Sequence, residues 1–297
     1  MRPKLLAAAT LTAVLALAGC GSDSLGGDTK KGDGAGKVTV DEAAAAKVPQ
    51  AIKDKGKLVV GTDASYAPSE FLDADGKTVI GFDVDLFNAV AAKLGLKVEW
   101  NPAKFDSIIT GVNGGKYDVG VSSFTVNTDR QKQANMISYF NAGTQWAAAP
   151  GNPKGVDPAK PCGLTVAVQK ATVQQEADLP PKQEACKKEG KPLEVLVYEG
   201  QDQATAAVVA GKADAMLADS PVVAYAVQQS DGKLEAVGDI YDAAPYGYVV
   251  SKENTDLADA IVLALQSLQK DGGYEKALKG WGVEQGAISD FGVNPVK

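Results

Sequence analysis

Residues 81–100, GFDVDLFNAVAAKLGLKVEW, contain the pattern that decides the fold class. Apolar residues recur in this stretch at intervals of three and four, as on the buried face of a helix: Leu86, Ala89, Val90 and Leu94. We expect Asp83 to cap the start of the helix and Gly95 to end it. Residues 96–100 then return as a strand. A helix followed at once by a strand indicates an α/β fold.

Short strands and helices continue to alternate on both sides of this stretch. A strand is predicted at Lys57–Gly61, before the helix. After it, a second helix begins at Phe105 and ends before Gly114, and a buried strand follows at residues 117–121. The whole region therefore has the pattern of a sheet covered by helices.

Part of this pattern recurs further along the chain. The segment GKYDV at residues 115–119 is echoed by GKADA at residues 211–215. The strand at residues 58–61 is echoed by residues 164–168. Two similar lobes are the economical explanation. The alternative is that Gly-Lys-x-Asp is a common turn between a helix and a strand.

Two breaks in the pattern mark where the chain passes between the lobes. Residues 142–158 contain three prolines and several glycines, which predicts a crossing segment followed by a loop. A second break, at Pro245-Tyr246-Gly247, precedes a strand at residues 248–250, and Thr255 can then cap a long amphipathic helix. The predicted lobes are residues 57–143 plus 248–297 (lobe 1) and residues 144–247 (lobe 2). Two crossings make a two-strand hinge on which the lobes close.

The N-terminus has the pattern of a lipoprotein signal peptide over residues 1–20. Two basic residues precede an apolar stretch that is too short to span a bilayer. The segment LAGC at residues 17–20 resembles the bacterial lipobox, which implies a lipid on Cys20. The alternative is a secretory peptide with an incidental cysteine. We expect residues 21–50 to be a flexible tether and the protein to sit on the extracytoplasmic face of the cell membrane, in the periplasm if the envelope has two membranes.

Composition narrows the classes of function. The 297 residues include 37 acidic and 30 basic side chains, a net charge of -7, so we expect no nucleic-acid partner. The chain contains no histidine, and its carboxylates do not fall at calcium-loop spacing, so we expect no metal site and no cofactor. With Cys20 set aside, Cys162 and Cys186 are an even pair for an oxidising compartment, which predicts a disulfide. Two free buried thiols are the alternative.

Four segments carry a resemblance to a known family. They are GFDVDLF at residues 81–87, GTDASYAP at 61–68, SSFTVNTDR at 122–130 and ADS at 218–220. In this order and spacing they resemble the family 3 extracellular solute-binding proteins, the polar amino acid receptors of ABC importers, over about residues 57–283. The resemblance implies a type II periplasmic-binding-protein fold, with two α/β lobes on a two-strand hinge and a ligand cleft between them. It also implies a monomer that takes an amino acid to ABC permease subunits.

The resemblance implies ligand-binding roles for ten residues. They are Asp63, Tyr66, Phe105, Ser122, Ser123, Thr125, Arg130, Gln169, Thr172 and Asp219. Arg130 would bind the α-carboxylate bidentately, since its planar fork suits that task better than lysine. Asp219 would pair with the ammonium, helped by the oxygens of Ser123 and Thr125. The alternative for Arg130 is a surface arginine in the first turn of a helix, and the alternative for Asp219 is a plain helix cap.

The remaining positions concern the ligand side chain and the second lobe. Tyr66 and Phe105 match aromatic rings that sandwich the side chain, although both are also candidates for the core. Asp63 matches an acid that meets the far end of a polar or cationic side chain; its alternative is a capping role after the first strand. Gln169 and Thr172 would supply contacts from lobe 2 near a helix start.

The sequence departs from the family pattern at two places. Ala171-Thr172-Val173 stands where the family commonly has Gly-Thr-Thr, and Ser69 stands where an aromatic residue is usual. These departures weaken the assignment of lobe 2 contacts and of the exact ligand. With an acid at Asp63 and an amide at Gln169, glutamine, arginine, lysine and histidine rank above glutamate and aspartate as ligands.

Two other classes of function compete with solute binding. One is an enzyme on the same fold, such as a cyclohexadienyl dehydratase-like lyase, which needs a general acid or base in the cleft. Without histidine only a displaced Glu or Lys could serve. The predicted lipid anchor and the intact set of amino acid-binding motifs argue against catalysis, so we expect a protein that is not an enzyme. The other is the sensing module of a receptor, which would continue into a transmembrane helix.

Overall fold

The computed structural model describes residues 38–296, so the predicted signal peptide, Cys20 and the first part of the tether lie outside the described residues. For the last part of the predicted tether the prediction is wrong, because the chain there already forms two short helices, α1 (Glu42–Lys47) and α2 (Gln50–Lys55). The Asp41 side chain caps α1 by accepting a hydrogen bond from the Ala44 N–H at 3.0 Å. Ala44 is fully buried in the core that includes helix α9 (Thr255–Asp271). An alanine-rich run with a good cap and a buried face forms a helix and not a spacer.

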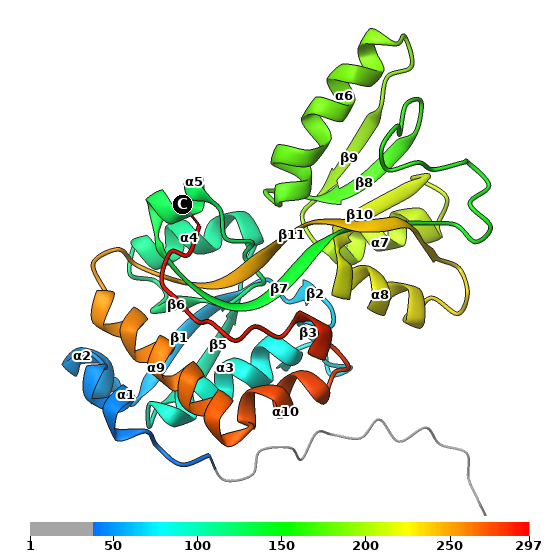
Figure 1. Ribbon diagram of the computed structural model, residues 1–297. Coiled ribbons are helices and arrows are strands. Elements are labelled where there is room, and N and C mark those ends of the chain that lie inside the picture. The colour runs from blue at the N-terminus through cyan, green and yellow to red at the C-terminus, as the bar shows by residue number, and fades with distance from the viewer. Residues whose placement is uncertain (1–37, 297) are drawn as a thin grey trace, which may run out of the picture. The chain divides into compact units, whose positions relative to one another are not determined.

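Eight strands form one sheet in the order β5-β1-β6-β11-β7-β10-β8-β9 (Figure 1). These strands are β1 (Lys57–Thr62), β5 (Lys97–Pro102), β6 (Val119–Gly120), β7 (Asn135–Ala148), β8 (Thr165–Gln169), β9 (Glu194–Tyr198), β10 (Ala215–Asp219) and β11 (Glu235–Val250). β1 pairs in parallel with β5 and β6 at one end, and β8 pairs in parallel with β9 and β10 at the other. The long strands β7 and β11 run antiparallel between the two ends.

The ends of the sheet belong to two lobes, and β7 and β11 connect them. Lobe 1 here means β1, β5, β6, the small sheet of β2 (Ser65–Tyr66), β3 (Glu70–Leu72) and β4 (Val79–Ile80), and helices α1, α2, α3 (Phe82–Lys93), α4 (Phe105–Asn113), α5 (Thr128–Gln133), α9 and α10 (Gly273–Lys279). Lobe 2 means β8, β9, β10, a π-helical turn at Gln174–Asp178, and helices α6 (Leu179–Lys188), α7 (Gln201–Val209) and α8 (Ser220–Gln229). A short 3-10 turn at Glu284–Gly286 precedes the C-terminal segment.

The crossing strands are the predicted two-strand hinge. They pair from Glu235 opposite Ala148 at one end to Val250 opposite Asn135 at the other, with register shifts between. The lobe limits predicted after residues 143 and 247 fall inside β7 and β11, and we keep those limits as a proposal. The fold is thus a two-lobed α/β architecture with a shared sheet.

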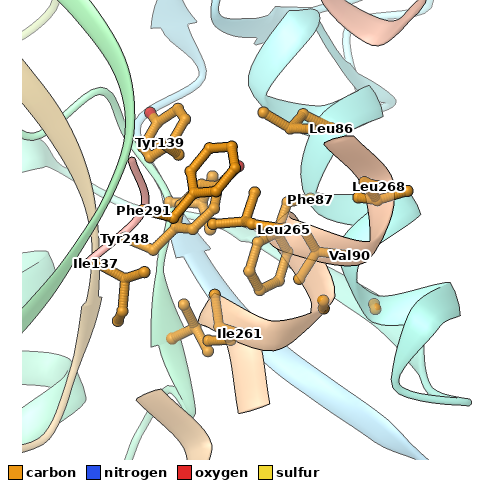
Figure 2. Close-up of a cluster of buried hydrophobic side chains, with 14 of the residues drawn as sticks. Leu86, Phe87, Val90, Ile137, Tyr139, Tyr248, Ile261, Leu265, Leu268 and Phe291 are labelled. Atoms are coloured by element: carbon orange, nitrogen blue, oxygen red, sulfur yellow. The ribbon is translucent and has the colours of Figure 1, made fainter. Parts of the chain in front are cut away.

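The largest core lies in lobe 1, where α3 and α9 pack against the sheet. Figure 2 shows Leu86, Phe87 and Val90 of α3 facing Ile261, Leu265 and Leu268 of α9. The Tyr139 and Tyr248 rings of the crossing strands stack at 3.9 Å beside them, and Phe87 meets Tyr248 edge-on at 4.9 Å. This packing anchors the hinge strands to lobe 1. Lobe 2 has separate cores on the two faces of β8 and β10.

Three local predictions differ from the structure. Asp83 does not cap α3; it lies in the first turn, fully buried, and the cap position belongs to Gly81. Gly81 has φ 140°, and a Cβ there would lie 2.0 Å from the Ser69 carbonyl oxygen, so only glycine fits. Thr255 is the first residue of α9 and Asn254 holds the cap position. Pro245–Gly247 is not a break but part of β11, because the Pro245 carbonyl accepts from the Val126 N–H and pairing with β7 continues.

Cys162 and Cys186 are joined by a disulfide, with their Cα atoms 4.9 Å apart. It ties the loop before β8 to helix α6, and the closed loop spans 24 residues. A loop of this length corresponds to a stabilisation of roughly 3 kcal/mol. Within residues 38–296, no helix is both long and apolar enough to cross a membrane.

Candidate functional site

All ten residues predicted to bind ligand line one narrow cavity, together with Val173 and Gln174. The carboxyl ends of β1, β6, β8 and β10 bring many of them there, since a lining residue ends each of these strands or follows it within two residues. Open α/β sheets place their ligand sites at this edge. Asp63, Ser122, Gln169 and Asp219 follow or end the four strands in turn. The sequence motifs therefore converge in space although they span more than half of the chain.

Arg130 is a buried cation at the start of α5, with only 8% of its surface exposed. One guanidinium nitrogen, Nη1, donates to the Thr125 carbonyl at 2.9 Å, and Nη2 donates to the Ala171 carbonyl of lobe 2 at 2.9 Å. Its guanidinium carbon lies 5.4 Å from the centre of the Phe105 ring and 5.6 Å from that of Phe124. Among the ion pairs of the described residues, none includes Arg130.

The position of Arg130 makes it a strong candidate for binding an anion. Desolvation lowers the pKa of its guanidinium, although Glu176 and Asp219 act in the opposite direction. Because a guanidinium has five N–H donors, donors remain beyond the two bonds to carbonyl oxygens. A desolvated cation that has donors to spare and forms no ion pair within the described residues gains from a carboxylate ligand. The alternative of a surface arginine does not fit its burial.

Asp219 ends β10 and occupies the cap position of α8, but its side chain makes no capping hydrogen bond. Its Oδ2 accepts from the Tyr66 hydroxyl at 2.9 Å and from the Tyr246 hydroxyl at 2.8 Å, and its Oδ1 accepts from Gln174 Nε2 at 2.8 Å. Burial raises the pKa of this carboxyl, and these hydrogen bonds and Arg130 oppose the rise. Asp219 is thus a carboxylate held in the cavity wall by three donors.

Asp63 lies just after β1 and links the two lobes. Its Oδ1 accepts from the Ser65 hydroxyl at 2.6 Å, and its Oδ2 accepts from the Phe105 N–H at 3.0 Å and from Gln169 Nε2 at 3.1 Å. Burial raises the pKa of Asp63 even so. Because the Gln169 amide belongs to lobe 2, this contact crosses the cleft.

The aromatic residues of the cavity are placed by different partners. Tyr66 is buried and its hydroxyl is held by Asp219, so its ring faces the cavity from lobe 1 while its oxygen reaches lobe 2. Phe105 is half-buried and stacks on Phe124 with ring centres 4.6 Å apart and planes 19° apart. Phe105 therefore belongs both to the cavity wall and to a packed aromatic pair.

Sequence reasoning missed Gln174 and Tyr246. Gln174 is buried and bridges Thr144 Oγ1 at 3.0 Å and Asp219, so it holds that carboxylate from a second side. The run ATVQ places Gln174 two residues after Thr172 at the start of the π-helical turn, which could have marked it. Tyr246 gave no such signal, since a Pro-x-Gly segment is typical of a turn.

The cavity is closed by hydrogen bonds between the lobes. Its free volume is about 10 Å³, which is close to the space that one water needs. Arg130 to Ala171, Gln169 to Asp63 and Tyr66 to Asp219 are bonds across the cleft. A molecule of several non-hydrogen atoms is far larger than this space, so it could enter only if the lobes separated and some of these bonds were replaced.

A second cavity lies on the other side of Arg130. It has a volume of about 270 Å³ and is lined by residues of α4 and α5, by Phe124 and Asn127, and by Ala171, Val173, Glu176 and Ala177 of lobe 2. Phe105, Arg130 and Val173 line both cavities and so form the wall between them.

Ion pairs between charged residues at the rim of the cavity also cross the cleft. Lys170 of lobe 2 lies 2.8 Å from Asp106 of lobe 1, and Lys104 of lobe 1 lies 2.9 Å from Glu199 of lobe 2. Hydrogen bonds to Asp106 and Glu199 raise the pKa of Lys170, and those from Lys104 and Lys170 lower the pKa of Glu199. These pairs are exposed, and exposed ion pairs contribute little net stability. They can be broken at small cost when the lobes open.

Ala171 stands where the family commonly has glycine, and its backbone has φ 60°. A side chain in this left-handed region costs about 1 kcal/mol. We expect Ala171→Gly to relieve this strain, partly offset by the extra freedom of glycine in the unfolded chain, and so to leave the protein equally stable or up to about 1 kcal/mol more stable. Urea unfolding of the two proteins measures the difference, and a loss of more than about 1 kcal/mol would contradict the strain.

Comparison with known proteins gives the family. The chain matches the model for bacterial extracellular solute-binding proteins, family 3, over residues 58–284. It is 40% identical over 250 residues to the arginine-binding protein ArgT of Corynebacterium glutamicum, covering 84% of this chain and 82% of that protein. It is 25% identical to the ABC transporter glutamine-binding protein GlnH of Bacillus subtilis, covering 93% and 95% of the two chains.

Solved structures agree with this result. An ancestral arginine-binding protein bound to arginine is 33% identical, with a TM-score of 0.68 over 76% of this chain and 98% of that one. An ancestral amino acid-binding protein described as a precursor of cyclohexadienyl dehydratase is also 33% identical, with a TM-score of 0.68 over 78% and 97%. The fold, the order of the motifs and these matches lead to one conclusion. The chain belongs to the bacterial extracellular solute-binding proteins of family 3.

Proposed function

We propose that this protein is the extracytoplasmic binding component of an ABC importer and that its ligand is a basic amino acid, with arginine as first choice. The observation that carries the choice is the balance of charge in the cavity. Its wall contains two carboxyl groups, Asp63 and Asp219, and one cation, Arg130. A basic amino acid brings two positive groups and one negative group, so it complements this set.

The three charged residues can each hold one group of such a ligand. Arg130 binds the α-carboxylate, Asp219 binds the α-ammonium, and Asp63 binds the cationic end of the side chain. An amino acid with a neutral side chain would leave Asp63 without a charged partner in a buried place, which is costly. The Tyr66 and Phe105 rings flank the aliphatic part, and Gln169 and Thr172 close the site from lobe 2.

The relatives support an amino acid and favour arginine. The relative from Corynebacterium glutamicum is named for arginine, and so is the ancestral protein solved with arginine bound. The relative from Bacillus subtilis is named for glutamine, and another, TcyJ from Escherichia coli, is named for L-cystine. Family membership therefore leaves the ligand's side chain open, and the charge balance of the cavity is the observation that favours a basic one. We further propose that the protein acts as a monomer held at the membrane by a lipid on Cys20.

Isothermal titration of the chain from residue 21 onward tests the ligand. Arginine and citrulline differ mainly in the charge of the side-chain end, so they are the matched pair. We expect arginine to bind with a Kd of about 1 μM and citrulline to bind about a hundredfold more weakly, because citrulline cannot pair with Asp63. Lysine should bind and glutamate should not.

Two results would contradict the choice of ligand. One is equal affinity for arginine and citrulline, which would mean that Asp63 does not read the side-chain charge. The other is tight binding of glutamate. Mass spectrometry would show whether a bound ligand is converted into a product. Such a conversion would support the lyase alternative, which a precursor of cyclohexadienyl dehydratase among the similar structures makes worth testing.

A further inference from the structure

Glu70 of β3 and Asp83 of α3 are two fully buried carboxyl groups directly behind the cavity. Neither lines the cavity, but both touch serines that do. The Ser122 hydroxyl donates to Glu70 Oε1 at 3.2 Å, and the Ser123 hydroxyl is 3.3 Å from Glu70 Oε2 and 3.3 Å from Asp83 Oδ2. The pair thus forms a second layer behind the wall.

These contacts decide which way the serine hydroxyls point. A hydroxyl has one hydrogen and two lone pairs. The Ser122 hydrogen goes to Glu70, and one of its lone pairs receives the Asp63 N–H at 2.9 Å, which leaves one lone pair. The Ser123 hydrogen goes to the acids, which leaves both lone pairs. Both serines therefore offer acceptors to the cavity, which suits an ammonium or another N–H donor.

The two carboxyl groups need a proton between them. The Ser123 hydroxyl lies 3.3 Å from an oxygen of each, so the two buried carboxyl groups are close neighbours, and ionising both of them at once is costly. Asp83 Oδ2 accepts from the Tyr139 hydroxyl at 2.5 Å and from the Ser123 N–H at 3.2 Å. Asp83 Oδ1 is buried and, within the described part of the chain, receives no hydrogen bond from another residue. A proton on this oxygen, or one donated to it, would supply the hydrogen bond that it lacks.

The surroundings favour one proton on the pair near neutral pH. Burial raises the pKa of both carboxyl groups, so the pair holds a proton near neutral pH. No ion pair of residues 38–296 includes either carboxyl group. The titratable groups that act on the pair are Asp63, Tyr66, Tyr139, Tyr246 and Tyr248.

We propose that Glu70 and Asp83 are positioning residues for the ligand: they hold the Ser122 and Ser123 hydroxyls as acceptors, and they keep a shared proton that leaves to solvent when a cationic amino acid binds. The inference rests on the proposed function, because the positive groups of the ligand are what favour the fully ionised pair. It predicts that ligand binding is coupled to proton release.

The test compares the wild type with Glu70→Gln, Asp83→Asn and the exposed control Glu184→Gln. Titration of arginine from about pH 5.5 to about pH 8.5, in two buffers with different heats of ionisation, gives the affinity and the number of protons released. In Glu70→Gln the amide N–H₂ donates to a serine and turns that hydroxyl hydrogen into the cavity. We expect about tenfold weaker binding at pH 8 and less proton release in both variants, and wild-type values in the control. Asp63 and Asp219 titrate in every protein, so the difference from wild type belongs to the pair.

A second arm needs no ligand. Because the pKa values of Glu70 and Asp83 are raised in the folded protein, the folded protein binds more protons than the unfolded chain in this pH range. The wild-type Tm should therefore rise as pH falls from about 8 to about 5. The rise should be smaller by about 3 °C or more in Glu70→Gln and Asp83→Asn. The two substitutions act on different carboxyl groups, so either folded variant decides.

The outcomes separate this inference from the proposed function. If arginine does not bind to the wild type but the Tm difference is present, the proposed ligand is wrong and the shared proton stands. If folded variants show the wild-type Tm profile, or wild-type affinity and proton release, the pair is only structural and the inference is overturned.

Discussion

Arg130→Ala is expected to weaken amino acid binding on the order of a thousandfold. The substitution leaves the ligand carboxylate in a buried site without its only cationic neighbour among the cavity-lining residues 63–219. Removing one partner of a buried ion pair costs about 3–5 kcal/mol, and each 1.4 kcal/mol is tenfold in affinity. Isothermal titration with the ligand that binds the wild type best measures the change.

Two further variants make the Arg130 result specific. Arg130→Lys keeps the charge but loses the planar fork, so we expect an intermediate loss of about tenfold to a hundredfold. Lys132→Ala removes an exposed cation on the same helix, whose ion pair within residues 38–296 is with Asp129, and this variant should bind like the wild type. A folded Arg130→Ala protein with affinity within about threefold of wild type would show that the carboxylate is bound elsewhere.

The fold could be predicted from the sequence because its local patterns agree with one another. The helix and strand patterns around residues 81–100 gave an α/β class, and the family motifs brought ten residues to one cavity. The sequence is least informative where burial in the folded protein determines the role of a side chain. Asp83 has the sequence position of a helix cap, but the chain brings Tyr139, Ser123 and Glu70 around it from other elements. No local pattern reports such a surrounding.

Long-range pairing also explains the residues that were missed. Tyr246 reaches Asp219 because β11 pairs with β7 across the cleft, and this pairing overrides the turn preference of the Pro-x-Gly segment. The register of β11 shifts between Tyr246 and Gly247, so an irregular strand accommodates residues that usually end one. The sequence alone assigns the alanine-rich residues 42–47 to the flexible tether. They form a helix because α9 provides a surface against which Ala44 is buried.

Closure of the two lobes depends on the same groups that would bind the ligand. Three hydrogen bonds across the cleft use Arg130, Asp63 and Asp219, and exposed ion pairs at the rim add to them. A ligand that binds the closed form must replace these bonds, so only the excess of its contacts over them appears as affinity. A ligand therefore favours the closed form only by as much as it binds the closed form more tightly than the open form.

Asp219→Asn should change binding and stability in opposite directions, and the second effect makes it the more informative substitution. It removes the proposed negative partner of the ligand ammonium, so we expect binding to weaken by about a hundredfold or more. The free protein should become more stable at about pH 8, because burial raises the pKa of Asp219 and ionisation there costs folding free energy. As pH falls and Asp219 takes up its proton in the wild type, the two stabilities should approach each other.

Titration and thermal unfolding at about pH 8 and about pH 5 measure both effects, and Asp231→Asn, an exposed acid of the same lobe, is the control. The amide keeps an oxygen for the Tyr66 and Tyr246 hydroxyls, and a flip of the Gln174 amide restores its bond, so the wall can remain intact. Weaker binding with higher stability would mean that the carboxylate serves the ligand at the expense of the fold. Lower stability with unchanged binding would mean the reverse, that Asp219 is held by three donors only to join the lobes.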